Sequence, residues 1–220
     1  MDFVSSVIAS MENGRTVDAL YLDFSRAFDS LNHNLLVEKI RKYGIPNDSL
    51  RWLSSYLSDR SLQVRVNDVL STAFTATSGV PQGSHLGTVL FLIYVQDLTV
   101  ALNVNHSMYA DDLKLSWEID GSSDHRILQH CYNQVAHWGN MNNLKLNPTK
   151  CQVITFSRRR NHISHHVHHL GDLALPRVTE VKDLGVFLDE QLNFRRHYDR
   201  TIAKARITLG RPEQFEAEPC

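Results

Sequence analysis

The chain has 220 residues, 42% of them hydrophobic, with 23 basic residues, 24 acidic residues and a formal net charge of −1. This length and composition are typical of one folded domain with a sizeable core, and they exclude a disordered chain. Because basic and acidic residues are nearly equal in number, the chain lacks the excess of positive charge expected of a protein that binds nucleic acid by itself. A role with nucleic acid must therefore depend on local patches or on further protein parts.

Cysteines and targeting signals narrow the cellular setting. The three cysteines have no CxxC spacing, which favours free thiols in a reducing compartment over disulfides or a zinc site. Residues 1–11 lack a basic start, and the longest apolar run, residues 89–95, is well short of the roughly 20 residues of a membrane span. We therefore expect an intracellular protein, in the cytoplasm or nucleus, with no signal peptide, transmembrane segment or membrane partner.

Apolar patterns predict strands and helices in the first half of the chain. "VDALYLDF", residues 17–24, is short and almost wholly apolar, which predicts a strand buried on both faces and interrupted by Asp23. Helical spacing over 29–43 ends at "GIP", and a second short helix is expected over 49–57, with Trp52 in the core. Residues 62–74 alternate in polarity around "ND", which indicates a β-hairpin.

The second half continues in the same way. Ser84 is placed to cap a helix over residues 86–97. Residues 108–117 predict strand, turn and strand, with Asp111 and Asp112 at or beside the turn. Further expected elements are a helix over 127–138 with Trp138 in the core, strands over 151–156 and 181–188, and a last helix over 195–209 whose Ala and Ile residues face inward. This order indicates an α+β domain over 1–209 and a loose tail over 210–220.

Three aspartates are the strongest chemical signal. Asp23, near the end of a buried strand, costs several kcal/mol if charged and unpaired, so a capped or salt-bridged aspartate is the simplest reading of it alone. Asp111 and Asp112 repel each other unless a cation neutralises them. Carboxylates converging from two strand ends form a divalent-metal site, where two Mg²⁺ ions about 4 Å apart activate a hydroxyl and stabilise leaving pyrophosphate. The pattern predicts phosphoryl transfer.

Three other features carry both a functional and a structural reading. Phe28 follows Asp23 by five residues and is either a floor for a sugar or a core residue. "SGVPQGSHLG", residues 78–87, has three glycines that let backbone N–H groups approach a base pair or phosphate, or simply connects a hairpin to a helix. "SRRRNHISHHVHHLGD", residues 157–172, has irregularly spaced histidines, which favours a solvated, flexible loop over a metal or phosphate site, although its arginines can touch a nucleic-acid backbone.

Five segments in this order resemble motifs A to E of the reverse transcriptase domain of non-long-terminal-repeat (LINE-type) retrotransposons. The segments are "YLDFSRAFDS", "SGVPQGSHLGTVLFLIYVQDL", "YADDLKL", "WGNMNNLKLNPTKCQVITFSR" and "VKDLGVFLDEQLNF". The resemblance covers roughly residues 17–209. It implies a right-hand polymerase palm, an antiparallel sheet with helices on one face, with the fingers largely missing and the thumb incomplete. The last segment resembles the family's primer grip.

The resemblance also implies a metal site. Asp23 and Asp111 match the two metal-ligating aspartates, Asp112 matches the second aspartate of the hairpin, and the backbone C=O of Phe24 matches a further ligand. The implied cofactor is a pair of Mg²⁺ ions, with Mn²⁺ as a substitute. Lys150 matches a motif D lysine that can protonate pyrophosphate as it leaves. From the sequence alone, an exposed lysine at a strand start is an equally good reading of Lys150.

Substrate contacts follow from the same resemblance. Phe28 matches the residue that screens the sugar 2′-hydroxyl, and Gln82 and Gly83 match residues that contact the template base and the incoming nucleotide. The implied partners are an RNA template, a DNA primer and deoxynucleoside triphosphates. Thr88 and Gln96 depart from the proline and asparagine of many relatives.

Three functions therefore remain in view. The first is RNA-directed DNA polymerase activity. The second is an inactive retrotransposon remnant, or a recruited palm fragment acting as an interaction module, because only 22 residues precede Asp23. The third is an RNA-templated RNA polymerase, which the bulky ring of Phe28 disfavours.

Overall fold

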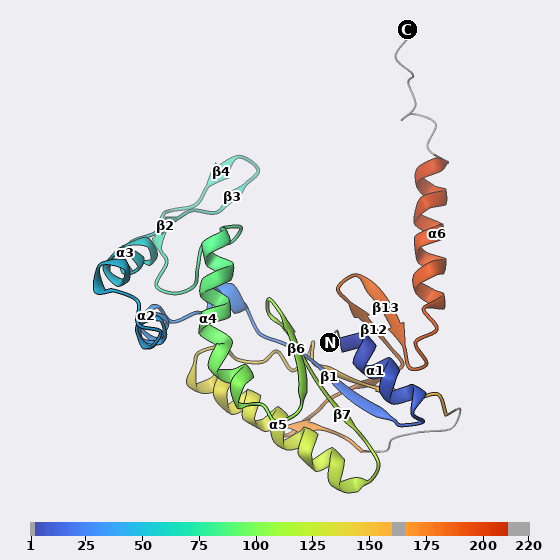
Figure 1. Cartoon of the computed structure of the whole chain (residues 1–220). Coiled ribbons are helices and arrows are strands. Elements are labelled where there is room, and N and C mark those ends of the chain that lie inside the picture. Colours follow the sequence, from blue (N-terminus) through green and yellow to red (C-terminus); the bar gives the residue numbers. More distant parts are fainter. Residues whose placement is uncertain (1–2, 160–165, 211–220) are drawn as a thin grey trace.

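A five-stranded sheet forms the centre of the fold (Figure 1). Across the sheet the strands are β11 (Arg177–Val178), β8 (Gln152–Phe156), β1 (Val17–Asp23), β7 (Asp112–Glu118) and β6 (Asn105–Tyr109). The computed structural model describes residues 3–159 and 166–210. β1 is antiparallel to both neighbours and β6 is antiparallel to β7, whereas β11 lies parallel to β8 at the edge. The expected central buried strand and the strand–turn–strand at 108–117 are confirmed.

Helices and a large apolar core cover one face of this sheet (Figure 1). Helices α4 (His85–Ala101) and α5 (Ser122–Met141) lie on this side of the sheet, whereas α2 (His33–Lys42) packs against α4 and α3 (Asn47–Leu57) packs against α2, farther from the strands (Figure 1). All four helices are close to the expected ranges. The side chains of Leu20 and Leu22 point from β1 into this core. The hydroxyl of Ser84 accepts a hydrogen bond from the Gly87 N–H at 2.9 Å, which confirms the expected helix cap.

The opposite face carries a second, smaller core. Helix α1 (Phe3–Glu12) and the hairpin of β12 (Glu180–Asp183) and β13 (Val186–Asp189) pack there. Val17 and Ala19 point to this face because successive residues of a strand alternate. The single strand expected over 181–188 is therefore two strands, and the turn between them has positive φ at Leu184 and Gly185.

Shorter elements lie at the periphery. Ala27–Asp29 forms a 3₁₀ turn after β1. The expected hairpin at 62–74 is confirmed, and its turn residues Asn67 and Asp68 both have positive φ, as in a type I′ turn. The hairpin consists of β2 (Ser61–Leu62), β3 (Arg65–Val66), β4 (Val69–Leu70) and β5 (Phe74–Thr75), in which β2 pairs with β5 and β3 pairs with β4. Another short antiparallel pair is formed by β9 (His169–Leu170) and β10 (Leu173–Ala174).

Two expected core placements are wrong. Helix α6 (Arg195–Leu209) extends away from the body in Figure 1 and buries none of its residues, so that Ile207, for example, is 65% exposed. Trp52 is 61% exposed and stacks on Tyr56 at the surface. Helical periodicity identifies an apolar face, but it does not say whether a partner covers that face. Trp138 does pack against the core, edge-on to Phe24.

Other expectations have mixed outcomes. Cys131 and Cys151 are buried free thiols, as expected, whereas Cys220 and residues 211–220 of the predicted tail lie outside the described residues. In the histidine-rich segment, residues 160–165 also lie outside them. The expectation of a solvated loop is wrong for the part that follows, because His168 is fully buried and His169–Leu170 forms β9. In the described part of the chain, no helix has the length and apolar character required to span a bilayer.

Candidate active site

Two of the three aspartates meet at neighbouring strand ends. Asp23 is the last residue of β1, Asp112 is the first residue of β7, and the two are directly opposite each other in the antiparallel register. Opposed residues of an antiparallel pair project from the same face of a sheet. Both carboxylates therefore lie on the face that carries the β12–β13 hairpin, away from the large helical core.

Asp111 is held beside them by a tight turn. Tyr109 and Asp112 are paired, which leaves Ala110 and Asp111 as the two turn residues between β6 and β7. Ala110 has a φ of 52°, a left-handed conformation that is unfavourable for a residue with a side chain and costs on the order of 1 kcal/mol. The pairing on both sides of the turn maintains this strain and fixes adjacent carboxylates at the sheet end.

The electrostatics of the aspartates are suited to a cation. Burial raises the pKa of Asp112, and the negative charge of Asp111 raises it further. One oxygen of Asp23, Oδ2, is buried and has no hydrogen-bond partner among the described residues. A metal ion would relieve both conditions. Among the described residues, however, the carboxylate oxygens of these three aspartates do not all lie close enough to one another to bind a single ion as they stand.

Lys150 lies next to Asp23. Its Nζ atom is 3.4 Å from Asp23 Oδ2, and its side chain is 64% exposed. The loop that carries it is tied to motif A, because the Asn147 N–H donates to the Asp23 carbonyl at 2.8 Å and the Lys150 N–H donates to the Asn147 carbonyl at 3.1 Å. Lys150 is thus an exposed residue just before β8 whose ammonium lies beside the Asp23 carboxylate.

A cavity of about 210 Å³ at this sheet end reveals residues that sequence reasoning missed. Besides Asp23, Asp112 and Lys150, it is lined by Lys114 and Asp183, which form a buried ion pair between β7 and β12. The only signal in the sequence was a lysine at an alternate position of "DLKL", on the same face as Asp112. Its partner comes from the distant hairpin, which local spacing does not reveal.

The two motif A phenylalanines have different surroundings. The Phe24 side chain is buried. Its backbone lies opposite Leu146 in an antiparallel β-bridge. The hydrogen bonds of this bridge are made by the residues on either side of Phe24, the Asp23 C=O and the Ser25 N–H. Because backbone groups alternate in direction along a strand, the Phe24 C=O is directed to the opposite side, that of β7. Phe28 is half-buried and stacks on Phe91 with 4.7 Å between ring centroids, so its core reading is correct for at least part of the ring.

The glycine-rich segment is docked on motif A. The Val80 N–H donates to the Phe28 carbonyl at 2.8 Å, and the Gln82 side-chain amide donates to Asp29 Oδ1 at 2.9 Å. A Cβ atom on Gly79 would lie 2.6 Å from the Asp29 Cα, so this glycine serves a close approach between two protein segments. Gly83, by contrast, has no atom within 4 Å of an added Cβ. Gln82 and Gly83 are exposed, on the side where a ligand can approach.

A second cavity, of about 960 Å³, opens beside Gln82 and Asp29. Arg26 and Arg60 contribute positive charge to its lining, and Leu62 and Phe74 of the peripheral hairpin contribute apolar surface. The Arg60 guanidinium is engaged in holding the Gly79 carbonyl at 2.6 Å. Arg26 is exposed, so it is the arginine better placed to meet a phosphate.

Comparison with known proteins decides the family. The model of the family described as "Reverse transcriptase (RNA-dependent DNA polymerase)" matches residues 8–188. The chain belongs to this reverse transcriptase family. The matched range contains all the predicted site residues and ends inside β13.

The relatives of this reverse transcriptase domain are of the non-long-terminal-repeat kind. It is 29% identical over 208 residues to the probable RNA-directed DNA polymerase from transposon BS of Drosophila melanogaster, covering 90% of this chain and 23% of that protein. It is 28% identical over 219 residues to the RNA-directed DNA polymerase from mobile element jockey of the same species, covering 94% and 23%. The chain thus spans about a quarter of the length of these relatives.

Solved structures show the same fold. The telomerase from Candida tropicalis in complex with a fragment of telomeric RNA aligns with a TM-score of 0.58 at 13% identity, covering 88% of this chain and 33% of that one. The telomerase from Candida albicans aligns with the same TM-score at 12% identity, covering 84% and 31%. The expected α+β fold of a right-hand polymerase is therefore confirmed for this reverse transcriptase domain.

Proposed function

We propose that this chain is the palm of an RNA-directed DNA polymerase, which extends a DNA primer with deoxynucleoside triphosphates along an RNA template. The observation that carries the proposal is the pairing of Asp23 with Asp112 across β1 and β7, with Asp111 in the adjoining turn. Membership of the reverse transcriptase family supports it. Because the relatives are much longer than this chain, the proposal concerns the palm's part in a larger enzyme.

Members of this family normally use divalent metal ions, and the residues present fit such ions. Two observations support this fit: Asp23 Oδ2 is buried and accepts no hydrogen bond from the described residues, with only the Lys150 ammonium nearby, and the pKa of Asp112 is raised. Asp23, Asp111 and the backbone C=O of Phe24 are the proposed ligands, with Asp112 completing the negative site. When bound, two Mg²⁺ ions, or Mn²⁺ in their place, supply the positive charge that activates a 3′-hydroxyl and stabilises the leaving pyrophosphate.

Protein groups around the aspartates complete the proposed chemistry. The Nζ atom of Lys150, held beside Asp23, is a proton donor for pyrophosphate as it departs. Its 64% exposed side chain is free to swing from the carboxylate towards a phosphate. The ion pair of Lys114 and Asp183 forms the floor of the cavity and attaches the β12–β13 hairpin, the proposed primer grip, to the strand that begins with Asp112.

Selection of substrate is assigned to motifs A and B. The stack of Phe28 on Phe91 fixes the plane of the Phe28 ring, and a fixed ring beside the nucleotide sugar excludes a 2′-hydroxyl. Gln82 and Gly83 contact the template base and incoming nucleotide in this proposal. Gln82 lines the cavity of about 960 Å³ together with Arg26, which is placed to meet the template phosphates.

Primer extension tests the proposal. In the jockey enzyme, the segment that corresponds to this chain is replaced by this chain. The hybrid is supplied with an RNA template, a DNA primer, Mg²⁺ and deoxynucleotides. We expect extension that Asp111→Ala lowers by at least about three orders of magnitude, because the charge of the reaction is then poorly compensated. Failure of the folded hybrid to extend the primer, while the parental jockey enzyme does so, would favour the inactive palm fragment.

A further inference from the structure

A buried carboxylate on the helical face of the sheet has no part in the proposed polymerase site. Asp18, the second residue of β1, is 0% exposed. Thr155 donates a hydrogen bond to its Oδ1 at 2.6 Å, and both terminal nitrogens of Arg177 lie within 3.3 Å of its oxygens. Asp18 and Asp23 are an odd number of residues apart, so they project from opposite faces of β1, about 16 Å from each other along the strand.

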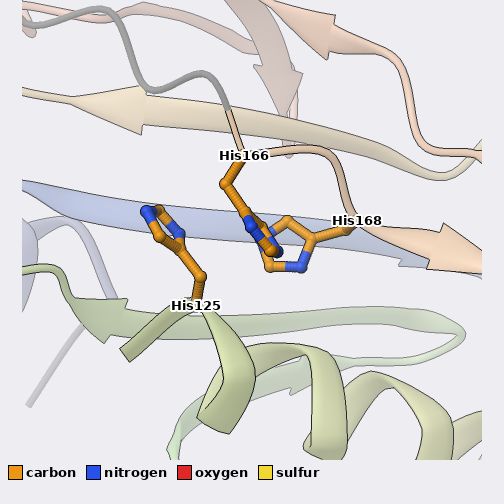
Figure 2. A group of neighbouring side chains, drawn as sticks. All are labelled: His125, His166 and His168. Atoms are coloured by element: carbon orange, nitrogen blue, oxygen red, sulfur yellow. The ribbon is translucent and has the colours of Figure 1, made fainter. Parts of the chain in front are cut away.

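Three histidines gather around Asp18. Figure 2 shows that His125 comes from α5, whereas His166 and His168 come from the segment that leads into β9, with the rings beside the blue strand β1. One ring nitrogen from each histidine lies within 4.8 Å of the other two. The rings of His125 and His166 are stacked at 4.5 Å, and His168 is edge-on to His166 at 4.7 Å.

These imidazoles have buried ring nitrogens that make no hydrogen bond to the described residues, although His125 and His168 lie near the Asp18 carboxylate. His168 is 0% exposed, and both of its ring nitrogens lack a hydrogen-bond partner among the described residues. The same holds for His125 Nδ1 and His166 Nε2. A buried polar atom without a partner typically costs about 1–3 kcal/mol, so several of them in one place indicate a ligand that uses them all.

We propose that His125, His166 and His168 bind a Zn²⁺ ion, with Asp18 as the neighbouring carboxylate that completes the site. Zinc takes imidazole nitrogen and carboxylate oxygen at about 2.0–2.2 Å, which places ligands of a tetrahedral site about 3.4 Å from each other. Asp18 Oδ2 already lies 3.3 Å from His125 Nδ1 and 3.8 Å from His168 Nε2. The three nitrogens lie within 4.8 Å of one another, and the stacked rings of His125 and His166 would have to rotate to bring them into this range.

The donor set selects the metal. Three imidazoles favour Zn²⁺ and related transition ions, whereas Mg²⁺ prefers oxygen ligands, so this site and the aspartate site call for different ions. The Arg177 guanidinium, 3.1 Å from Asp18 Oδ1, compensates the charge of this carboxylate together with the nearby His168 and His125.

The surrounding contacts hold the site in place. The Arg177 guanidinium that pairs with Asp18 also donates to the His166 carbonyl at 3.0 Å. Gln129 on α5 makes two hydrogen bonds to the backbone of His169, at 2.8 and 2.9 Å. A bound Zn²⁺ would therefore join α5, β1 and the segment before β9 behind the catalytic face, as a structural clamp.

Metal binding by the full chain, purified without a histidine tag, tests the proposal. After chelation and dialysis, Zn²⁺ is added with a chromogenic competitor, and bound metal is counted by mass spectrometry. We expect one Zn²⁺ per chain, a rise in Tm on adding Zn²⁺, and visible Co²⁺ bands typical of four-coordinate sites. The variants His125→Gln and His168→Gln should lose all three signals, whereas His130→Gln, an exposed histidine on the same helix, should keep them.

Comparing the variants of the proposed ligands with the His130→Gln control distinguishes binding at the buried site from binding by exposed histidines. Circular dichroism establishes that each variant is folded, and His125→Gln is the milder change because its side chain is 12% exposed. The proposal is overturned if the wild-type chain retains no Zn²⁺, or if the glutamine variants bind it as the His130→Gln control does. Asp111→Ala, which removes a ligand of the other site, should leave Zn²⁺ binding unchanged, so this test does not depend on polymerase activity.

Discussion

Lys114 of β7 and Asp183 of β12 form an ion pair that is almost completely buried beneath the paired aspartates Asp23 and Asp112. The Tyr21 hydroxyl also donates to Asp183, at 3.3 Å. The pair therefore joins β7, the strand that follows the turn with Asp111, to the hairpin proposed as primer grip. A change that breaks this ion pair should therefore lower the stability of the fold and also disturb the geometry of the proposed site.

Removing one member of this pair should be costly. Lys114→Ala leaves Asp183 charged and buried without its main partner, so we expect a loss of about 3–5 kcal/mol in the free energy of unfolding, measured by urea denaturation. Lys182→Ala, one residue before Asp183 but exposed, should change it by less than about 0.5 kcal/mol. The double variant Lys114→Met/Asp183→Leu should recover most of the loss; equal losses in Lys114→Ala and Lys182→Ala would contradict the buried pair.

Two glycines of motif B should respond differently to the same substitution. Gly79 and Gly83 both have positive φ, so alanine is strained at either position by about 1 kcal/mol. At Gly79 the added Cβ also meets the Asp29 backbone, whereas at Gly83 it enters open space. Gly79→Ala should therefore destabilise by about 1–3 kcal/mol more than Gly83→Ala in thermal or urea unfolding. Equal effects would mean that the segment does not dock on motif A as described.

Two buried tyrosines make a second matched pair. Tyr94 and Tyr132 are both 0% exposed, but the Tyr94 hydroxyl donates to the Asn142 carbonyl at 2.6 Å, whereas the Tyr132 hydroxyl has no partner among the described residues. Tyr94→Phe should cost about 1 kcal/mol, and Tyr132→Phe should be neutral or stabilising by a similar amount. Urea unfolding at neutral pH measures both.

The alkaline side of the stability curve adds an independent test of Tyr132. Burial raises the pKa of its phenol in the folded state, and Cys151 raises it further. When the pKa of a group is higher in the folded state than in the unfolded state, its contribution to the free energy of unfolding is complete at pH values below the unfolded pKa, which is about 10 for tyrosine. This contribution is lost as the pH rises from the unfolded pKa towards the folded pKa. Tyr132→Phe should therefore lose stability less steeply above about pH 10 than wild type, whereas Tyr198→Phe, at the exposed helix α6, should match wild type.

Sequence reasoning succeeded where local pattern determines structure. The apolar run of β1 and the paired aspartates of the β6–β7 turn are short-range features, and the motifs around them identify the family. It failed for α6 and Trp52, because periodicity does not show whether a partner covers an apolar face. It missed Asp18 and its histidines because one histidine comes from α5 and two from a segment much later in the chain. The irregular spacing of the histidines within that segment gave no sign of the cluster, because its members are brought together only by the folded structure.

The repulsion between the site aspartates makes a last prediction about stability and function together. After burial, the charge of Asp111 is the largest cause of the raised pKa of Asp112, and Asp111→Asn removes it. Without Mg²⁺ the variant should therefore be more stable than wild type, by only a few tenths of a kcal/mol because solvent screens the charge of the exposed Asp112. Millimolar Mg²⁺ should raise the Tm of wild type, because a ligand that binds the folded state stabilises it, but should raise that of the variant little. Asp199→Asn, on the exposed surface of α6, should respond to Mg²⁺ as wild type does. An unchanged stability in Asp111→Asn, together with equal Mg²⁺ responses in all three proteins, would show that these aspartates do not form a strained cation site. The opposed shifts in stability and Mg²⁺ response would instead mean that the fold tolerates this repulsion because the site serves an ion.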